Sequence, residues 1–278
     1  MKFRTIVNIE KPPFLISPCE RILFIGSCFA DNIGHRFEEE LFDTVINPFG
    51  VMYNPASILH SVEKYEGEPL AVAVFTLGTN HVYILKGTDE IVDNCRKRPH
   101  NLFREEQLTV DQCCEYLSAA IDKLIERNPS IKIIITVSPI RYAKYGFHGS
   151  QLSKSVLLLA ADRLTRKYAG RAVYFPAYEI INDELRDYRF YKEDMLHPSA
   201  QAVEYIWERF SACFLSEETH RFIAEWRPLK EAFGHKPFNP DSSEYKEFIA
   251  ATRRKADAMA EKYPNMPRPW LKQAPQTE

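Results

Sequence analysis

The sequence predicts an α/β fold: a three-layer αβα sandwich around a five-stranded parallel sheet, with a helical extension at the C-terminal end. Short apolar runs alternate with longer segments whose apolar residues recur at helical spacing, which is the pattern of βαβ units. The 278 residues are enough for one α/β domain with an annex. Hydrophobic residues make up 45% and charged residues 27%, a balance that excludes a disordered or fibrous chain.

Five apolar runs are expected to form the strands of the sheet. They cover residues 21–25, 44–46, 71–77, 131–137 and 172–175. Turn residues follow the first four runs, beginning at Gly26, Asn47, Gly78 and Ser138. A β-hairpin is predicted over residues 82–92, where Lys86-Gly87-Thr88-Asp89 separates two short apolar runs. None of the runs approaches the ~20 residues that a membrane span needs.

The segments between the strands carry helical periodicity and recognisable start signals. Residues 31–41 place Ile33, Phe37 and Leu41 on one stripe. Asn54-Pro55 opens the second helix, because a proline in the first turn loses no hydrogen bond. The other predicted helix starts are a capping box at Thr109-x-x-Gln112, a Ser153 cap before an apolar stripe, and Pro198 before the last core helix.

The last part of the chain is expected to be helical and to lie outside the sheet. We predict a core over residues 1–215 and an extension over residues 216–278, in which Phe222, Trp226 and Leu229 anchor a charged helix. A further helix is predicted over residues 243–262. The proline-rich tail from Tyr263 cannot continue it, and is expected to be draped on the surface or disordered.

Composition excludes several functional classes. Lys and Arg number 36 against 38 Asp and Glu, so no global positive field attracts nucleic acid or acidic lipid. The six cysteines include no CxxC pair, and no His, Asp and Glu residues stand at metal-ligand spacing, so no metal and no cofactor is predicted. The N-terminus has no apolar run of signal-peptide length, which favours a cytoplasmic protein with reduced thiols.

The candidate catalytic residues follow the ends of predicted strands, where an open parallel sheet forms its binding crevice. Ser27 stands in a strand-to-helix turn and is expected to project its hydroxyl into the crevice. Asp194-x-x-His197 follows the fifth strand, so that His197 can take the proton of Ser27 while Asp194 holds the imidazole. The N–H groups of Ser27 and Gly50 and the side-chain amide of Asn80 are predicted to stabilise an oxyanion.

These blocks resemble those of the SGNH (GDSL-like) hydrolases, and residues 26–30 spell Gly-Ser-Cys-Phe-Ala, the motif that names the GSCFA family. The stretches at residues 136–142, 152–160 and 185–210 are also similar to that family. The resemblance covers roughly residues 20–215. It implies a flavodoxin-like arrangement of the sheet, with Ser27 as nucleophile and Asp194 and His197 as its partners. Asn94 lies in a stretch that also resembles a family motif, so the choice between Asn80 and Asn94 as oxyanion donor is open.

Each candidate residue has a structural alternative. Ser27 can simply cap the first helix, and Cys28 can be buried packing or an alternative nucleophile. Asp194 and His197 can be ordinary surface residues before a helix. Arg141 and His148 are candidates for substrate binding, with structural roles as the alternative.

The sequence therefore predicts an ester hydrolase that forms an acyl-Ser27 intermediate on an O-acyl ester, with O-acetyl on a carbohydrate expected by analogy with the wider superfamily. The expected partner is a small-molecule or carbohydrate ester, with no nucleic acid and no membrane. One alternative is an O-acyltransferase of glycan modification, in which a hydroxyl replaces water. Another is a non-catalytic binding module on the same fold. The sequence leaves the acyl group, the acceptor and the oligomeric state open.

Overall fold

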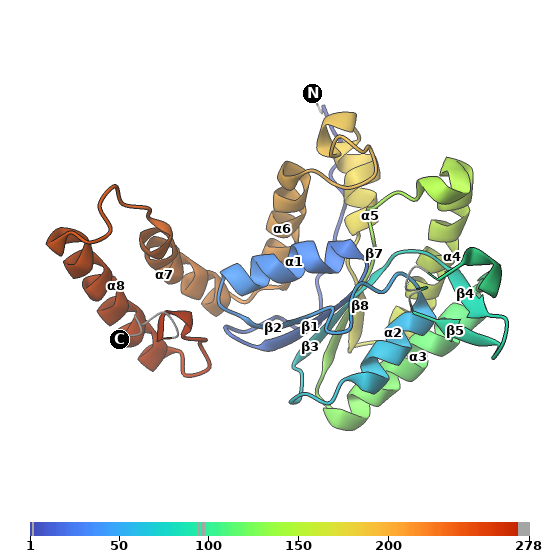
Figure 1. Cartoon of the computed structure of the whole chain (residues 1–278), viewed down its shortest axis with the longest axis horizontal. Coiled ribbons are helices and arrows are strands. Elements are labelled where there is room, and N and C mark those ends of the chain that lie inside the picture. Colours follow the sequence, from blue (N-terminus) through green and yellow to red (C-terminus); the bar gives the residue numbers. More distant parts are fainter. Residues whose placement is uncertain (2, 94, 96–97, 272–278) are drawn as a thin grey trace.

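A computed structural model describes residues 1, 3–93, 95 and 98–271 and confirms the predicted α/β fold (Figure 1). Five strands form the central sheet: β1 (Arg21–Gly26), β2 (Asp43–Ile46), β3 (Val72–Leu77), β7 (Lys132–Val137) and β8 (Ala172–Tyr174). Their order is β2-β1-β3-β7-β8, and every neighbouring pair is parallel. This is the flavodoxin-like order that the family resemblance implies.

Helices cover both faces of the sheet and make the three layers. On one face lie α1 (Cys28–Glu39) and α6 (Ala200–Phe214); on the other lie α2 (Pro55–Lys64), α3 (Val110–Arg127) and α4 (Gly146–Lys167). The side chains of successive strand residues point to opposite faces of the sheet: Leu23 packs with α2 and α3, whereas Phe24 packs with α1 and α6. Because both faces are covered, the strands are continuous apolar runs, which is why the sequence identified them.

The strand order reverses between β1 and β3, and this places the crevice. The chain leaves β1 toward β2 on one side and later returns to β3 on the other side of β1. Gly26 at the end of β1 pairs with Thr76 near the end of β3. The turns that follow these two strands therefore start beside each other, at the edge where ligands bind in open α/β sheets.

A second, smaller sheet extends the predicted hairpin. Strands β4 (His81–Leu85) and β5 (Glu90–Val92) are antiparallel, as expected, and a third strand, β6 (Phe103–Gln107), pairs with the other edge of β4. Strand β6 was not predicted because four of its five residues are polar and exposed. Short helical turns complete the description: η1 (His100–Leu102), η2 (Ala143–Tyr145), α5 (Ala177–Glu179), the π-helix η3 (Ile180–Leu185), η4 (Tyr188–Phe190) and η5 (Pro269–Leu271).

Most predicted helix starts are confirmed, and two are wrong by several residues. The capping box of Thr109 and Gln112 is present, and Asn54 caps α2 ahead of Pro55. Helix α1 begins at Cys28 rather than near residue 31, which makes Ser27 its N-cap. Helix α4 begins at Gly146, so that Ser153 is buried inside the helix instead of capping it.

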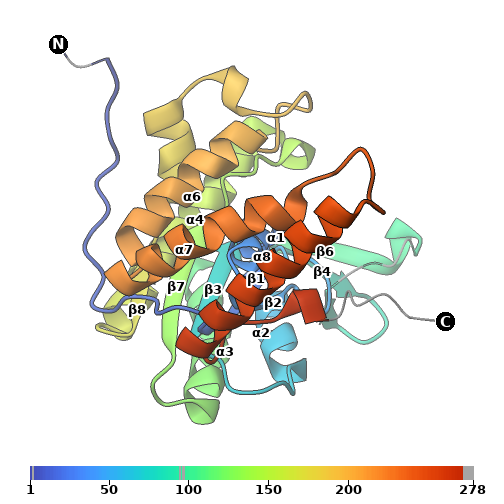
Figure 2. The same cartoon turned by 90° about the vertical axis from the view of Figure 1, so that its left-hand side faces the viewer.

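The extension consists of α7 (Glu217–Gly234) and α8 (Ser243–Lys262), which lie beside the core in Figure 1 and in front of it in Figure 2. The predicted anchors Phe222, Trp226 and Leu229 are buried in a cluster that also contains Cys19 and Leu41 of the core. The indole N–H of Trp226 donates to the carbonyl of Glu39 in the last turn of α1 (2.9 Å). The tail folds back as far as η5, where Trp270 stacks on Trp226. The boundary at residue 215 stays a prediction.

Across the described part of the chain, no helix is long and apolar enough to cross a membrane.

Candidate active site

The turn after β1 is built around a position that only glycine can occupy. Gly26 has φ +136°, and a Cβ there would stand 2.2 Å from the carbonyl oxygen of Thr76. Its N–H donates to Oδ1 of Asn47 (2.9 Å), and the side-chain amide of Asn47 donates to Asp31 on α1 (2.7 Å). Asn47 thus ties the ends of β1 and β2 to the first helix. The sequence marked Asn47 only as a strand-ending residue.

Ser27 does not project into the crevice as predicted. Its side chain is 0% exposed, its hydroxyl accepts the N–H of Phe29 (3.2 Å), and it lies 3.1 Å from the hydroxyl of Thr76. The cause is the early start of α1. As N-cap, Ser27 turns its oxygen back onto the first turn of the helix, where the N–H groups have no partner within the helix.

Cys28 presents its side chain beside the buried serine. It is half-buried, and its Sγ lies 3.8 Å from the phenol oxygen of Tyr53, a residue that is 41% exposed. Burial, followed by the contact with Cys28, raises the pKa of Tyr53 to about 12, so this phenol is neutral. Cys28 is the first residue of α1, so its own N–H points out of the helix end, where an anion is favoured.

Asp194 and His197 lie in contact on one tight loop. Nδ1 of His197 is 2.6 Å from Oδ2 of Asp194, while Oδ1 of Asp194 accepts the backbone N–H groups of Leu196 (2.8 Å) and His197 (2.9 Å). These two backbone donors, and then the imidazole, lower the pKa of Asp194 to about 2. Met195 between them has φ +57°, which closes the loop. The catalytic role of the pair remains a prediction.

Arg141 holds this loop against the end of β7. Its N–H donates to the carbonyl of Leu196 and its guanidinium to that of Met195, each at 3.0 Å. The next residue, Tyr142, stacks edge-to-face with Tyr53 (6.0 Å between ring centroids). A row of contacts therefore runs from Cys28 through the two tyrosines to the loop of Asp194 and His197.

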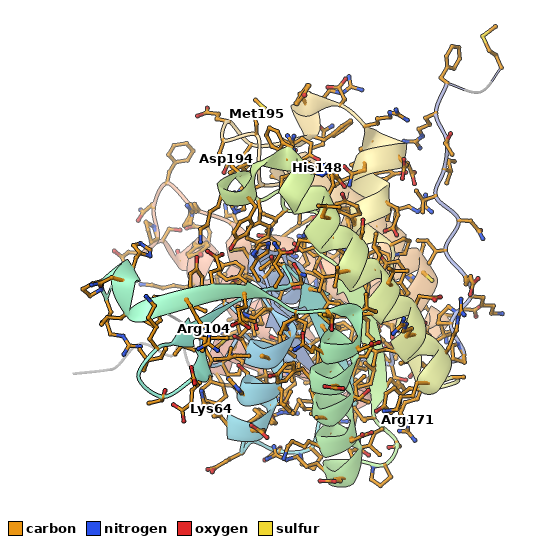
Figure 3. The ribbon with its side chains drawn as sticks, turned by 90° about the vertical axis from the view of Figure 1, so that its right-hand side faces the viewer. Lys64, Arg104, His148, Arg171, Asp194 and Met195 are labelled. Carbon is orange, nitrogen blue, oxygen red and sulfur yellow. The ribbon has the colours of Figure 1, made fainter. Side chains whose placement is uncertain are left out.

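Figure 3 shows Asp194, Met195 and His148 at one end of the molecule. Arg171, which precedes β8, lies toward the opposite end. The loop of Asp194 and His197 thus lies at the carboxyl end of the sheet, the same edge as the turn after β1.

Each predicted oxyanion donor has a hydrogen-bond partner inside the fold, and its catalytic role stays a prediction. The N–H of Ser27 donates to the carbonyl of Thr76 (3.0 Å), and the N–H of Gly50 donates to that of Asn47 (2.8 Å). The side-chain amide of Asn80 donates to the carbonyl of Leu108 (2.7 Å) at the base of the small sheet.

The predicted substrate-binding residues have three different outcomes. The guanidinium of Arg141 lies over the rings of Phe147 (4.1 Å) and Tyr191 (5.4 Å) and borders the loop of His197. His148 is exposed near the start of α4. Asn94 lies outside the described residues.

A buried lysine, missed by sequence analysis, joins the ends of β3 and β7. Lys154 is 1% exposed, and its ammonium donates to the carbonyls of Gly78 (2.7 Å) and Ser138 (2.8 Å). Burial lowers the pKa of Lys154 to about 7. The available signal was its position on the apolar stripe of α4, three residues before Leu157.

The described residues contain no group of three or more His, Cys, Asp or Glu that could hold a metal ion.

Comparisons with known proteins identify a family. The model of the GSCFA family matches residues 21–71 and 66–210, and that of the C-terminal domain of GSCFA domain proteins matches residues 226–267. No curated protein matches the chain. Similar solved structures include an acetyl-xylooligosaccharide esterase from Geobacillus (12% identity, TM-score 0.49, covering 72% of this chain and 95% of the esterase). A family 3 carbohydrate esterase from Talaromyces cellulolyticus is 11% identical (TM-score 0.44, covering 74% and 99%).

Proposed function

The chain belongs to the GSCFA family, and from this premise we propose that it is an acyl hydrolase that cleaves O-acyl esters at the carboxyl edge of its sheet. The observation that carries the proposal is the 2.6 Å contact between His197 and Asp194 on a loop held at that edge. A carboxylate paired with one imidazole nitrogen leaves the other nitrogen free to move protons.

The acid–base pair suits a reaction at neutral pH. Because its pKa is lowered to about 2, Asp194 stays ionised at neutral pH and accepts the Nδ1 proton of His197. Nε2 of His197 then has a lone pair for a proton from the nucleophile. In the second half of the reaction it takes a proton from water.

We assign the nucleophile to Cys28 in place of the predicted Ser27. A hydroxyl that is fully buried and engaged with Phe29 and Thr76 cannot meet a substrate without breaking the cap of α1. The half-buried thiol of Cys28 lies one residue on, beside the exposed Tyr53. A thiol also needs less activation than a hydroxyl to act as a nucleophile.

The reaction that follows is a two-step acyl transfer. Sγ of Cys28 bonds to the acyl carbon as its proton passes to His197, and the carbonyl oxygen becomes an oxyanion near the N–H of Cys28. The intermediate expels the alcohol, which takes the proton from His197, and an acyl-Cys28 thioester remains. Water then attacks the thioester carbon as His197 takes its proton. The C–S bond breaks, the carboxylic acid leaves, and His197 returns the proton to Sγ of Cys28, which restores the thiol.

The identity of the acyl group and of the alcohol is proposed by analogy with the wider SGNH superfamily. We propose an O-acetyl ester of a carbohydrate, because the rings of Phe147 and Tyr188 are exposed near this edge and a sugar ring can pack on an exposed aromatic side chain. If a second hydroxyl takes the place of water, the same intermediate gives an O-acyltransferase.

The test is hydrolysis of p-nitrophenyl acetate by the purified chain, with intact-mass spectrometry of the enzyme after rapid acid quenching. The proposal expects turnover and a transient mass increase of one acetyl group that hydroxylamine removes, as it removes thioesters. His197→Ala should abolish turnover, and His220→Ala, at an exposed histidine on α7, should not. A chain that binds esters without hydrolysing or transferring them would instead be the binding module.

A further inference from the structure

A cavity next to the loop of His197 is lined by more positive than negative side chains. It has a volume of about 260 Å³, and Arg141, Arg186, Asp187, Asn182, Tyr188 and Tyr191 border it. Two guanidiniums therefore line the cavity against one carboxylate. Among the described residues, no carboxylate forms an ion pair with Arg141 or Arg186. Oδ1 of Asp187 accepts the backbone N–H of Arg189 (2.9 Å), which directs that carboxylate to its own loop.

The backbone beside this cavity is held in uncommon conformations. Residues Ile180–Leu185 form a π-helix, and Arg186, which ends it, has φ +47°. A non-glycine residue in the left-handed region is strained, and π-helical turns and such strain are often found at functional sites. The strained position here is the one that carries an unpaired guanidinium.

Arg141 joins the cavity to the candidate active site. It borders the cavity, and the same guanidinium donates to the carbonyl of Met195 between Asp194 and His197. The rings of Phe147 and Tyr191 fix its plane. A planar guanidinium held in this way offers its remaining N–H groups to an oxyanion in a fixed direction.

We propose that this cavity binds an anionic group, a carboxylate or a phosphate, on the alcohol part of the ester substrate. The inference rests on the proposed function, because it places the anion beside the loop that carries His197. Arg186 supplies the free charge and Arg141 the oriented one. The preferred substrates are then acyl esters of acidic alcohols rather than of neutral ones.

Binding and turnover test the proposal separately. Calorimetric titration uses three reaction-product analogues that need no chemistry: 4-hydroxybenzoate, 4-hydroxyphenyl phosphate and the neutral 4-hydroxybenzamide. The wild-type chain should bind one or both anions more tightly than the amide, and the stronger anion identifies the source of the charge. Arg186→Gln should weaken anion binding roughly tenfold, the loss expected for one charged hydrogen bond, and leave the amide unchanged.

Kinetics with the matching acetate esters provide the second arm. For 4-acetoxybenzoate, Arg186→Gln should raise KM roughly tenfold with kcat nearly unchanged, whereas 4-acetoxybenzamide should react as in the wild type. Arg189→Gln is the control, because Arg189 lies on the same loop but stacks on Phe190 and does not border the cavity. The anion site would be overturned if the wild-type chain bound the anions and the amide with equal affinity. It would also be overturned if Arg186→Gln and Arg189→Gln weakened anion binding equally. Absence of any turnover with normal anion binding would count against the hydrolase alone.

Discussion

The side chains of Ser27 and Cys28 face different surroundings although the two residues are adjacent. The hydroxyl lies inside the fold against Thr76, and the thiol lies half-buried beside Tyr53. The N-cap geometry of α1 causes this difference. The hydroxyl of Ser27 accepts an N–H of the first helical turn, whereas Cys28 is the first residue of the helix and its thiol makes no such bond.

The first prediction separates these two residues. Ser27→Ala should lower the free energy of unfolding by about 1 kcal/mol, as the loss of a helix cap does, and should keep most of the esterase turnover. Cys28→Ala should abolish turnover and change stability by less than about 0.5 kcal/mol. Urea unfolding and p-nitrophenyl acetate hydrolysis measure both effects. Full activity in Cys28→Ala with none in a folded Ser27→Ala would restore the serine mechanism.

Asp194 provides the second prediction. Asp194→Asn should reduce kcat by roughly 10²–10⁴, because the amide no longer stabilises the imidazolium or selects the productive tautomer of His197. The melting temperature should change little, since Asp194 is a solvent-exposed loop residue. Steady-state kinetics and thermal unfolding check the two halves. A variant with normal kcat would show that Asp194 is only a loop-closing residue.

The third prediction concerns pH and Lys154. Folding lowers the pKa of this lysine from the ordinary ~10.4 to about 7, so between these values the unfolded chain binds more protons than the folded chain. Stability contributed by this group should therefore rise with pH between about 7 and ~10.4, by at most about 1.4 kcal/mol per pH unit, and stay level below pH 7, where both states are protonated. Urea unfolding at a series of pH values tests this.

Variants of α4 isolate the contribution of Lys154. Lys154→Met should lose the pH-dependent rise and should also be less stable at pH 8, because the carbonyls of Gly78 and Ser138 lose their donor. Lys167→Met, at an exposed position of the same helix, should retain the wild-type profile. Identical profiles for Lys154→Met and the wild type would contradict the buried charge.

The fourth prediction tests the turn after β1. Gly26→Ala should destabilise the fold by about 3 kcal/mol or more, since it combines a positive φ with a Cβ 2.2 Å from a backbone oxygen. Gly87→Ala is the matched control, because a Cβ there meets nothing within 4 Å. Thermal unfolding followed by circular dichroism compares the two. Similar melting temperatures would mean that the ends of β1 and β3 can separate without cost.

The sequence was informative where one local rule decides the structure. Strands buried on both faces are continuous apolar runs, and the caps at Asn54 and Thr109 have the side-chain chemistry that they need. Both were predictable for that reason. Strand β6 was not, because its partner β4 and not its own polar residues determines its conformation.

The candidate site shows the same division. The Asp194–His197 contact spans three residues and could be anticipated from spacing. The direction of the Ser27 hydroxyl could not, because it depends on where α1 begins and on Thr76, 49 residues away. The same holds for Asn80, whose amide is taken by Leu108, and for Lys154, whose acceptors end two separate strands.

The hydrogen bond between Trp226 on α7 and the carbonyl of Glu39 on α1 links the C-terminal helices to the helix that carries the candidate nucleophile. Helix α1 begins at Cys28, the candidate nucleophile, and ends at Glu39, whose carbonyl accepts the indole N–H of Trp226. A protein shortened after residue 215 would leave Cys19 and Leu41 uncovered and the far end of α1 unsupported. We expect such a fragment to aggregate on expression, so that the α/β core and its helical appendage must be produced as one polypeptide.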